Sequence, residues 1–183
     1  MLKAGVGFDA GIVKNLDHHL KQRIRKAAYA GPTLKALVAR PPELSVTFPE
    51  DGDNGGNYRA AFVVVTKVRH YGGAFVIAPD ADLAADELQV VMFMDCSRLG
   101  MVRALIGLAM GKNARLKKSA IRKTGELVGH IMKTHGVMIR ACKKVRITSL
   151  EPVPTQIDGE WLGYSPLDIR TGEQALKLIV PKS

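Results

Sequence analysis

Hydrophobic residues recur at every fourth position near the start of the chain. The series follows GVGFDAG and consists of Ile12, Leu16, Leu20, Ile24 and Ala28. Such spacing places the side chains on one face of an α-helix. Gly31-Pro32 would end that helix, because neither residue favours its continuation. We therefore predict an amphipathic helix close to the N-terminus.

From residue 44 the pattern changes to that of β-strands. LSVTF alternates hydrophobic and polar residues, and YRAAFVVVTKV is rich in β-branched residues and long enough for one central strand. AFVIA and ELQVVMFM follow, each after a short turn segment. Strands that are separated by short turns predict an antiparallel meander.

The middle of the chain is helical in pattern, and the last part returns to strands. RLGMVRALIGLAMGK predicts a mostly buried helix, and a second apolar stripe runs from Leu116 to Ile131. The later strand candidates are VMIRA, KVRITSL, TQID, EWLG, PLDIR and ALKLIV. Strands on both sides of a helical excursion predict an α+β fold that is mainly β. We expect an antiparallel β-sandwich with an N-terminal helix and a central helical excursion.

Length and composition are those of one globular domain, which we expect to span residues 1–183. Hydrophobic residues make up 46% of the chain and charged residues 24%, as in ordinary globular proteins. The apolar runs are far shorter than the roughly 20 residues of a membrane-spanning helix. The first residues lack the pattern of a signal peptide, so we expect a cytoplasmic protein. Cys96 and Cys142 have no metal-ligand spacing and are expected to be core thiols.

The charge balance favours anionic partners. The chain has 27 Lys and Arg against 17 Asp and Glu, a net charge of +10. Residues 112–123, KNARLKKSAIRK, hold a cluster of six cations: Lys112, Arg115, Lys117, Lys118, Arg122 and Lys123. Two interpretations stay open, a solvated helix face and a surface for anionic lipid headgroups or nucleic acid. The segment lacks aromatic residues for base stacking, which makes nucleic acid the less favoured partner.

Two apparent motifs are better explained structurally. GVGFDA has the spacing of a dinucleotide-binding turn, but only MLKA precedes it and no acidic residue follows at the required distance. We interpret its glycines as allowing close approach to a neighbouring backbone. Asp17, His18 and His19 are adjacent on a predicted helix, where their side chains diverge and cannot share one metal ion. We expect no metal site in this chain.

The segment QIDGEWLGYSP combines a turn with an acidic residue. Asp158-Gly159 strongly favours a two-residue hairpin, because both turn positions tolerate positive φ. Glu160 follows directly. From the segment alone, Glu160 is either a turn residue or a general base.

Four short segments together resemble the C-terminal domain of the diacylglycerol kinase-like lipid kinases. They are GFDA at residues 7–10, YGGAFVIAP at 71–79, IDGEWLG at 157–163 and ALKLIVP at 175–181. They occur in the family's order and cover nearly the whole chain. The resemblance implies that Glu160 is the general base that takes a proton from a lipid hydroxyl. It also places Asp9 and Asp158 near the substrate.

The chain also departs from the family. The family binds Mg-ATP through an N-terminal domain with a Gly-Gly-Asp-Gly-Thr loop, which this sequence lacks. Mg²⁺ and ATP are therefore expected for the parent enzyme, with no cofactor on this chain alone. The family's structural magnesium is held by an Asp-Gly pair where this chain has Ala85-Asp86, so we expect that site to be weak or empty. The basic stretch from Lys112 to about Val128 resembles an insertion.

These features predict the lipid-substrate domain of a lipid kinase. Its partners would be the N-terminal nucleotide-binding domain, the lipid substrate and an anionic membrane surface, with a cytoplasmic location peripheral to the membrane. The alternative is a non-catalytic basic module that binds nucleic acid or anionic membrane through residues 112–123. Whether the chain forms a homodimer is left open by the sequence.

Overall fold

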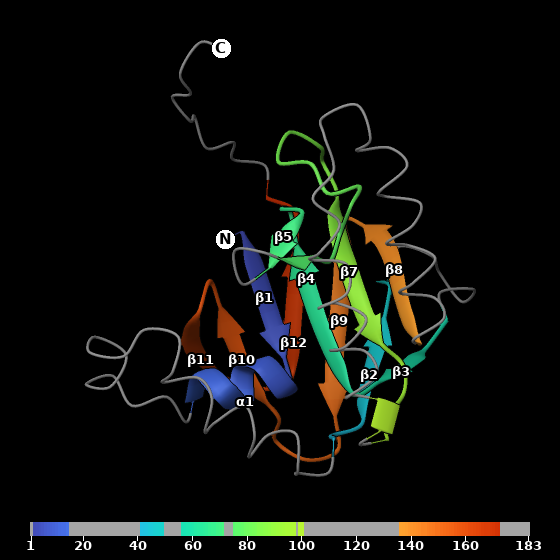
Figure 1. Ribbon diagram of the computed structural model, residues 1–183, viewed down its shortest axis with the longest axis vertical. Helices are drawn as coiled ribbons and strands as arrows, with labels where there is room; N and C mark the ends of the chain where they lie inside the picture. The colour runs from blue at the N-terminus through green and yellow to red at the C-terminus, as the bar shows by residue number, and fades with distance from the viewer. Residues whose placement is uncertain are drawn as a thin grey trace.

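Two antiparallel β-sheets pack face to face in the computed structural model, with one helix near their edge (Figure 1). The structure describes residues 2–14, 41–49, 56–71, 75–97, 99–100 and 136–172. Within these residues the strands account for most of the ordered backbone. The predicted mainly-β α+β fold is therefore confirmed.

The larger sheet has six strands, in the order β11-β10-β1-β4-β7-β8. Their bounds are Glu160–Tyr164 for β11, Pro154–Ile157 for β10, Lys3–Val6 for β1, Phe62–Thr66 for β4, Leu88–Phe93 for β7 and Val137–Cys142 for β8. The smaller sheet has four strands, in the order β12-β9-β2-β3. They are β12 (Leu167–Arg170), β9 (Lys144–Ser149), β2 (Leu44–Thr47) and β3 (Tyr58–Ala60). A third pair consists of β5 (His70–Tyr71) and β6 (Phe75–Val76), and the helix α1 is Phe8–Lys14.

The larger sheet is buried on both faces near its centre. All five residues of β4 are buried, and successive side chains of a strand point to opposite faces. Val63 and Val65 belong to the core between the two sheets, which also contains Val46 and Ile147 of the smaller sheet. Phe62 and Val64 belong instead to a second cluster that includes Ile77, Ala78 and Ala81. This double burial explains why β4 reads as a continuous apolar run.

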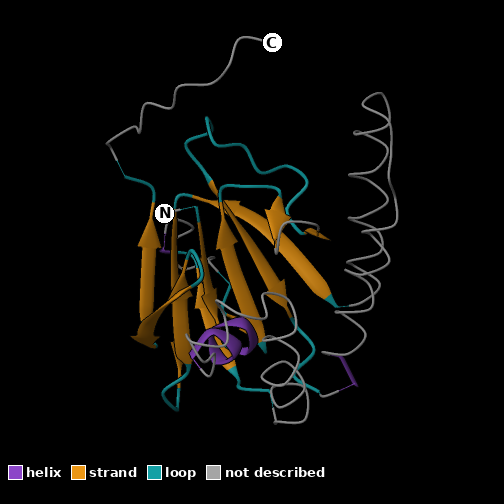
Figure 2. Cartoon of the chain, turned by 60° about the vertical axis from the view of Figure 1, so that its left-hand side comes forward, coloured by secondary structure: helices purple, strands orange, loops and turns teal. Residues whose placement is uncertain are grey.

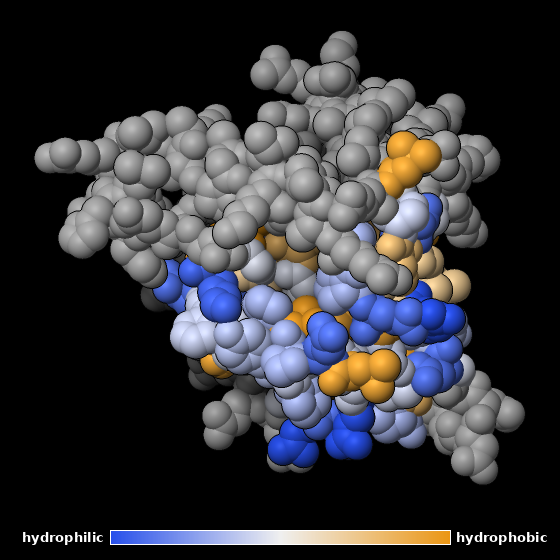
Figure 3. All heavy atoms as spheres, turned by 90° about the horizontal axis from the view of Figure 1, so that it is seen from below, coloured by the Kyte–Doolittle hydropathy of each residue, from blue (hydrophilic) through white to orange (hydrophobic). Residues whose placement is uncertain are grey.

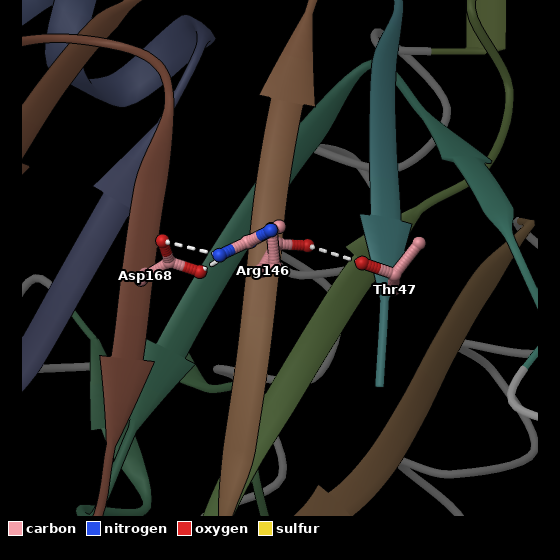
Figure 4. A network of polar contacts seen from close by, with 3 residues as sticks. All are labelled: Thr47, Arg146 and Asp168. Atoms are coloured by element: carbon pink, nitrogen blue, oxygen red, sulfur yellow. Dashed lines mark hydrogen bonds and ion pairs between the residues drawn. The ribbon is translucent and has the colours of Figure 1, made fainter. Parts of the chain in front are cut away.

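The smaller sheet turns a polar face to solvent. Arg146 on β9 donates to both carboxylate oxygens of Asp168 on β12, at 2.7 and 3.2 Å. Its backbone oxygen accepts a hydrogen bond from Thr47 on β2 at 3.5 Å, so Arg146 lies between the two neighbouring strands (Figure 4). Arg146 lowers the pKa of the Asp168 carboxyl. Because both side chains are exposed, this pair adds little stability and marks a solvated sheet face.

Exposed hydrophobic side chains are mostly separated by hydrophilic ones, as the face in Figure 3 shows for the described residues. Leu2, Leu83, Leu99 and Leu150 are exposed singly, which is normal for a folded surface. Strand β11 differs, because Trp161, Leu162 and Tyr164 are all exposed on one short strand.

The sequence assigned most strands correctly but joined two that are separate. YRAAFVVVTKV is not one strand: Ala61 separates β3, in the smaller sheet, from β4, in the larger. At this point the amide of Ala61 donates to the backbone oxygen of Phe93 at 2.8 Å, which brings the chain into the larger sheet. The meander was also wrong in its middle strand. Within the described residues AFVIA pairs only through β6 with β5, and β4 pairs directly with β7.

The N-terminal helix begins earlier than predicted, at Phe8. The rest of that predicted helix, the central helical excursion and the strand ALKLIV lie outside the described residues. Strand β1 does precede the glycine turn, but it is antiparallel to both neighbours, β4 and β10. It therefore lacks the parallel partner that a dinucleotide-binding βαβ unit requires. No helix within the described ranges is long and apolar enough to cross a bilayer.

Candidate functional site

The hairpin that carries Glu160 is built around a two-residue turn. Strands β10 and β11 are joined by Asp158 and Gly159, with φ of 51° and 92°. Positive φ at both central positions is the feature of the type I′ turn, whose twist suits a hairpin. Asp tolerates this conformation and Gly adopts it freely. The predicted Asp-Gly hairpin is confirmed.

Asp158 fastens the turn to the start of β1. Its carboxylate accepts hydrogen bonds from the amides of Lys3, at 2.9 Å, and Leu2, at 3.1 and 3.2 Å. The Asp158 amide in turn donates to the backbone oxygen of Lys3 at 3.0 Å. These contacts give Asp158 a structural role, and its part in substrate binding stays a prediction.

Gln156 fastens the turn from inside the protein. The side chain is buried, with 1% of its surface exposed. Its Nε2 donates to Oδ2 of Asp9 at 2.5 Å, and its Oε1 accepts the amide of Gly159 at 2.8 Å. Both ends of the amide are therefore used, which a buried Gln requires. Through it the hairpin is connected to helix α1.

Helix α1 reaches the hairpin because the chain turns sharply at Gly7. Its φ is 104°, a region that side chains rarely adopt, and an added Cβ would lie 3.0 Å from the backbone oxygen of Ala61. The Gly7 amide donates to the backbone oxygen of Pro154 at 3.1 Å. Helix α1 then packs against β10 and β11, and Figure 2 shows it at the lower ends of the strands. The predicted close backbone approach is thus found at Gly7.

Asp9 on α1 is the centre of the polar contacts below the hairpin. Burial raises the pKa of its carboxyl, while hydrogen bonds from Tyr71 and Gln156 and the charge of Lys3 act in the opposite direction. The Tyr71 pKa is also raised, first by burial and then by the charge of Asp9. Gly5 leaves the room for this network. An added Cβ there would lie 2.7 Å from Asp9 Oδ2 and 2.8 Å from Gln156 Nε2.

Glu160 is an exposed residue at the start of β11. It follows the fixed turn directly and is paired across the hairpin with Ile157. Next to it on β11 lie Trp161 and Leu162, each 51% exposed, and Tyr164, 45% exposed. Lys14 at the end of α1 donates to the Tyr164 hydroxyl at 2.7 Å. The strand therefore carries both a carboxylate and exposed apolar side chains, on a backbone fixed from two sides.

The structure brings Asp9, Asp158 and Glu160 into one region, whereas the other predicted site residues lie outside the described part of the chain. Asp9 connects through Gln156 to the turn formed by Asp158 and Gly159, and Glu160 follows that turn. The six basic residues of 112–123, and Asp17, His18 and His19, lie outside the described residues. Cys96 and Cys142 are not joined in a disulfide, and both are half-buried at the edges of the hydrophobic clusters, where core thiols were expected.

Sequence reasoning missed two residues of this network and the partners of a third. Gly5 was expected to allow a close approach to a backbone, but the atoms that come close belong to the side chains of Asp9 and Gln156. Tyr71 lies in a segment that resembles the family, yet nothing local indicates that it contacts Asp9. Gln156 carries no signal at all, since its partners are 147 residues away and three residues away along the chain.

The position of the family's structural magnesium does not fit a metal ion in this chain. Ala85 offers no carboxylate there, and Asp86 forms an ion pair with Lys143 at 2.8 Å. Lys67 Nζ donates to the backbone oxygen of Ala85 at 2.7 Å. Across the described residues, no group of three or more His, Cys, Asp or Glu is arranged to hold a metal.

Two packed antiparallel sheets with a helix-supported Asp-Gly-Glu hairpin define a β-sandwich domain. A family model confirms this class: the YegS C-terminal NAD kinase beta sandwich-like domain matches residues 3–180. The chain belongs to this family, and it resembles the C-terminal domain of diacylglycerol kinase-like proteins.

Several known proteins are similar to this chain. The chain is 15% identical to a proposed diacylglycerol kinase from Bacillus anthracis str. Sterne of known crystal structure, with a TM-score of 0.52 over 92% of this chain and 48% of that one. A diacylglycerol kinase structure from the same organism gives 10% identity and a TM-score of 0.45, over 91% and 44%. An uncharacterized protein of Synechocystis sp. is 24% identical over 185 residues, 99% of this chain and 38% of its own length. The chain thus spans less than half the length of these proteins.

Proposed function

We propose that this chain is the lipid-substrate domain of a lipid kinase, and that Glu160 is the general base for phosphorylation of a lipid hydroxyl. Glu160 would accept the hydroxyl proton as the alcohol oxygen attacks the γ-phosphoryl of ATP, with ADP leaving. An N-terminal domain of the same kinase would bind ATP and Mg²⁺. Asp9 and Asp158 are proposed to lie near the substrate.

The observation that carries this proposal is the bracing of an exposed carboxylate. Phosphoryl transfer depends chiefly on alignment of the reacting groups. Glu160 is exposed on β11, and the turn before it is held by Asp158 on one side and by Gln156 on the other. An ordinary surface turn does not need a buried Gln side chain, itself bonded to the half-buried Asp9, to fix it.

The exposed apolar side chains of β11, the strand that carries Glu160, support a lipid as substrate. Trp161, Leu162 and Tyr164 are half exposed on the same strand. Aromatic residues with one apolar and one polar part suit the boundary between lipid and water. The positive charge of the chain would favour an anionic membrane surface.

The test is Glu160→Gln in the whole kinase, because this variant keeps size and hydrogen bonding but removes basicity. We expect turnover to fall by about a hundredfold or more, with little change in apparent lipid affinity, since the proton moves only in the transition state. The folding stability should stay close to wild type. Glu151→Gln is the control, because Glu151 is another exposed glutamate, in the segment before β10. Wild-type turnover in Glu160→Gln would make Glu160 a turn residue only.

A binding measurement on the chain alone separates the two candidate functions. The sequence contains no phosphate-binding glycine loop, so we expect calorimetry to find no micromolar ATP affinity for the isolated chain. Micromolar binding would contradict the division of labour between two domains. Duplex DNA bound much more tightly than anionic vesicles would favour the basic binding module instead.

A further inference from the structure

A loop rich in acidic residues is held in place by basic side chains. Residues 78–87, here named the acidic loop, connect β6 to β7 and contain Asp80, Asp82, Asp86 and Glu87. Ala78 and Ala81 anchor its first part in the second hydrophobic cluster. The second part, from residue 82 onward, is largely exposed and depends on polar contacts.

Two cations that follow β4 donate to backbone oxygens of this loop. Lys67 Nζ donates to the oxygen of Ala85 at 2.7 Å, and Arg69 Nε donates to the oxygen of Ala81 at 3.1 Å. Both contacts are partly buried. The direction of Lys67 is set locally, because the buried Thr66 hydroxyl bonds to both the amide and the oxygen of Val68. These charge-assisted bonds are stronger than neutral ones.

A third cation, Lys143, forms an ion pair with one of the four carboxylates of the loop, that of Asp86. Lys143 Nζ lies 2.8 Å from Asp86 Oδ2. The pKa of Asp86 is lowered, first by the hydrogen bond from Lys143 and its charge, and to a smaller extent by Thr171 and by the charge of Lys67. Asp86 therefore lies in the field of two ammonium groups.

These contacts occupy the oxygen atoms that a divalent cation would use. Magnesium requires a near-octahedral set of oxygen ligands, usually carboxylates, carbonyls and water. Here the Ala85 oxygen accepts from Lys67, and the Asp86 carboxylate is paired with Lys143. An incoming ion would have to displace Lys67 and remain beside two positive charges, which is electrostatically unfavourable.

We propose that Lys67, together with Arg69 and Lys143, acts as a built-in cation that orders the acidic loop in place of magnesium. The loop of this chain is then independent of divalent ions and unaffected by chelators. This inference concerns the architecture of the domain and does not depend on the role of Glu160. It can be tested on the chain itself.

The first test compares hydrogen exchange and thermal unfolding of the chain in MgCl₂ and in EDTA at equal ionic strength. Binding of an ion to the folded state would raise the melting temperature and protect the amides near the ion. We expect the same melting temperature, and unchanged exchange at the amides of residues 78–87. Slower exchange of these amides in magnesium alone would overturn the proposal, even if other parts of the chain also responded.

The second test removes the ammonium groups one at a time. Lys67→Met keeps most of the apolar stem but loses the ammonium group, and with it both the charge and the hydrogen bond to the Ala85 oxygen. We expect loop amides to exchange about tenfold faster. Lys143→Met should have a smaller effect, because its ion pair is exposed. Lys144→Ala is the control, since this neighbouring lysine starts β9 and is paired with Arg170 of β12 in the smaller sheet.

Unchanged loop exchange in Lys67→Met, or equal acceleration in Lys144→Ala, would show that the loop does not depend on the built-in cation. Should Lys67→Met fail to fold, the comparison of magnesium with EDTA on the unaltered chain still decides whether the loop needs a divalent ion.

Discussion

Gly5→Ala adds one methyl group at the most crowded point beneath the hairpin. The new Cβ would lie 2.7 Å from Asp9 Oδ2 and 2.8 Å from Gln156 Nε2. These two atoms are hydrogen-bonded to each other at 2.5 Å, so neither can move without weakening their bond. Gln156 is buried and also holds the Gly159 amide. The methyl group should therefore disturb the hairpin as well as the helix.

The expected loss of stability combines three contributions. A hydrogen bond to a charged group is worth about 1.5–3 kcal/mol, and the lower end applies because Asp9 is only half-buried by its surface area. Forcing an extra methyl into a packed site costs about 1–3 kcal/mol. Replacing glycine by alanine within a strand returns about 0.5–1 kcal/mol. The net destabilisation should be about 2–4 kcal/mol.

Denaturant unfolding of the chain measures this change, and Gly11→Ala is the matched control. Gly11 lies on α1, and an added Cβ there would meet nothing within 4 Å. Alanine at this helical position should stabilise the protein by about 0.5–1 kcal/mol. The two substitutions are chemically identical, yet we expect effects of opposite sign. A Gly5→Ala variant within about 0.5 kcal/mol of wild type would refute the crowded network beneath the hairpin.

Three further predictions concern Asp158 in the turn, the half-buried Asp9 and the basic segment of residues 112–123. Asp158→Ala should lower the unfolding free energy by about 1 kcal/mol or more, because alanine is strained at positive φ and cannot accept hydrogen bonds from the Leu2 and Lys3 amides. Asp158→Asn should keep most of the stability. Equal losses for the two variants in denaturant unfolding would contradict this prediction. Asp9 has a raised pKa, so the stability that it contributes is complete below its ordinary value of 3.8 and is lost as the pH rises through the folded value. The stability of Asp9→Asn relative to wild type should therefore increase between about pH 3 and about pH 7, and a constant difference would argue against the raised pKa. The chain should sediment together with phosphatidylglycerol vesicles at low salt, since each of the six cations of residues 112–123 can contribute up to ~1 kcal/mol to the binding free energy. Binding that survives roughly 1 M salt would indicate insertion into the membrane instead of attraction between charges.

Local chemistry explains which parts of the fold could be predicted from the sequence. The Asp158-Gly159 hairpin depends on φ preferences of two adjacent residues, so it was predicted with its flanking strands. The break at Ala61 was not, because residues 58–66 form one uninterrupted β-favouring run and such a run does not show where the chain passes from one sheet to another. The position of β6 was missed for a related reason: its pairing with β5 is local, but the hydrophobic pattern of AFVIA does not indicate which neighbouring strand it joins.

The candidate site shows the same limit more strongly. Glu160 could be singled out because it follows a recognisable turn, and Asp9 because it lies in a segment that resembles the family. Gln156 could not, although it is the residue that joins them. A buried Gln side chain leaves no local sequence pattern when its role is to bond a residue as distant along the chain as Asp9. The contact of Lys67 with the acidic loop was missed likewise, because Lys67 and Ala85 are 18 residues apart.

Three of the four segments that carried the resemblance converge on one hydrogen-bonded network, and the fourth, ALKLIVP, lies outside the described residues. GFDA supplies Asp9, the segment starting at Tyr71 supplies the phenol that bonds to it, and the Asp-Gly-Glu hairpin supplies the Gly159 amide held by Gln156. Each segment is short and common by itself, yet each needs the others to satisfy its buried polar groups. A buried polar group that loses its partner costs more than the bond itself contributes. The three segments therefore form a single unit, and a change in any one of them should be felt at the turn that precedes Glu160.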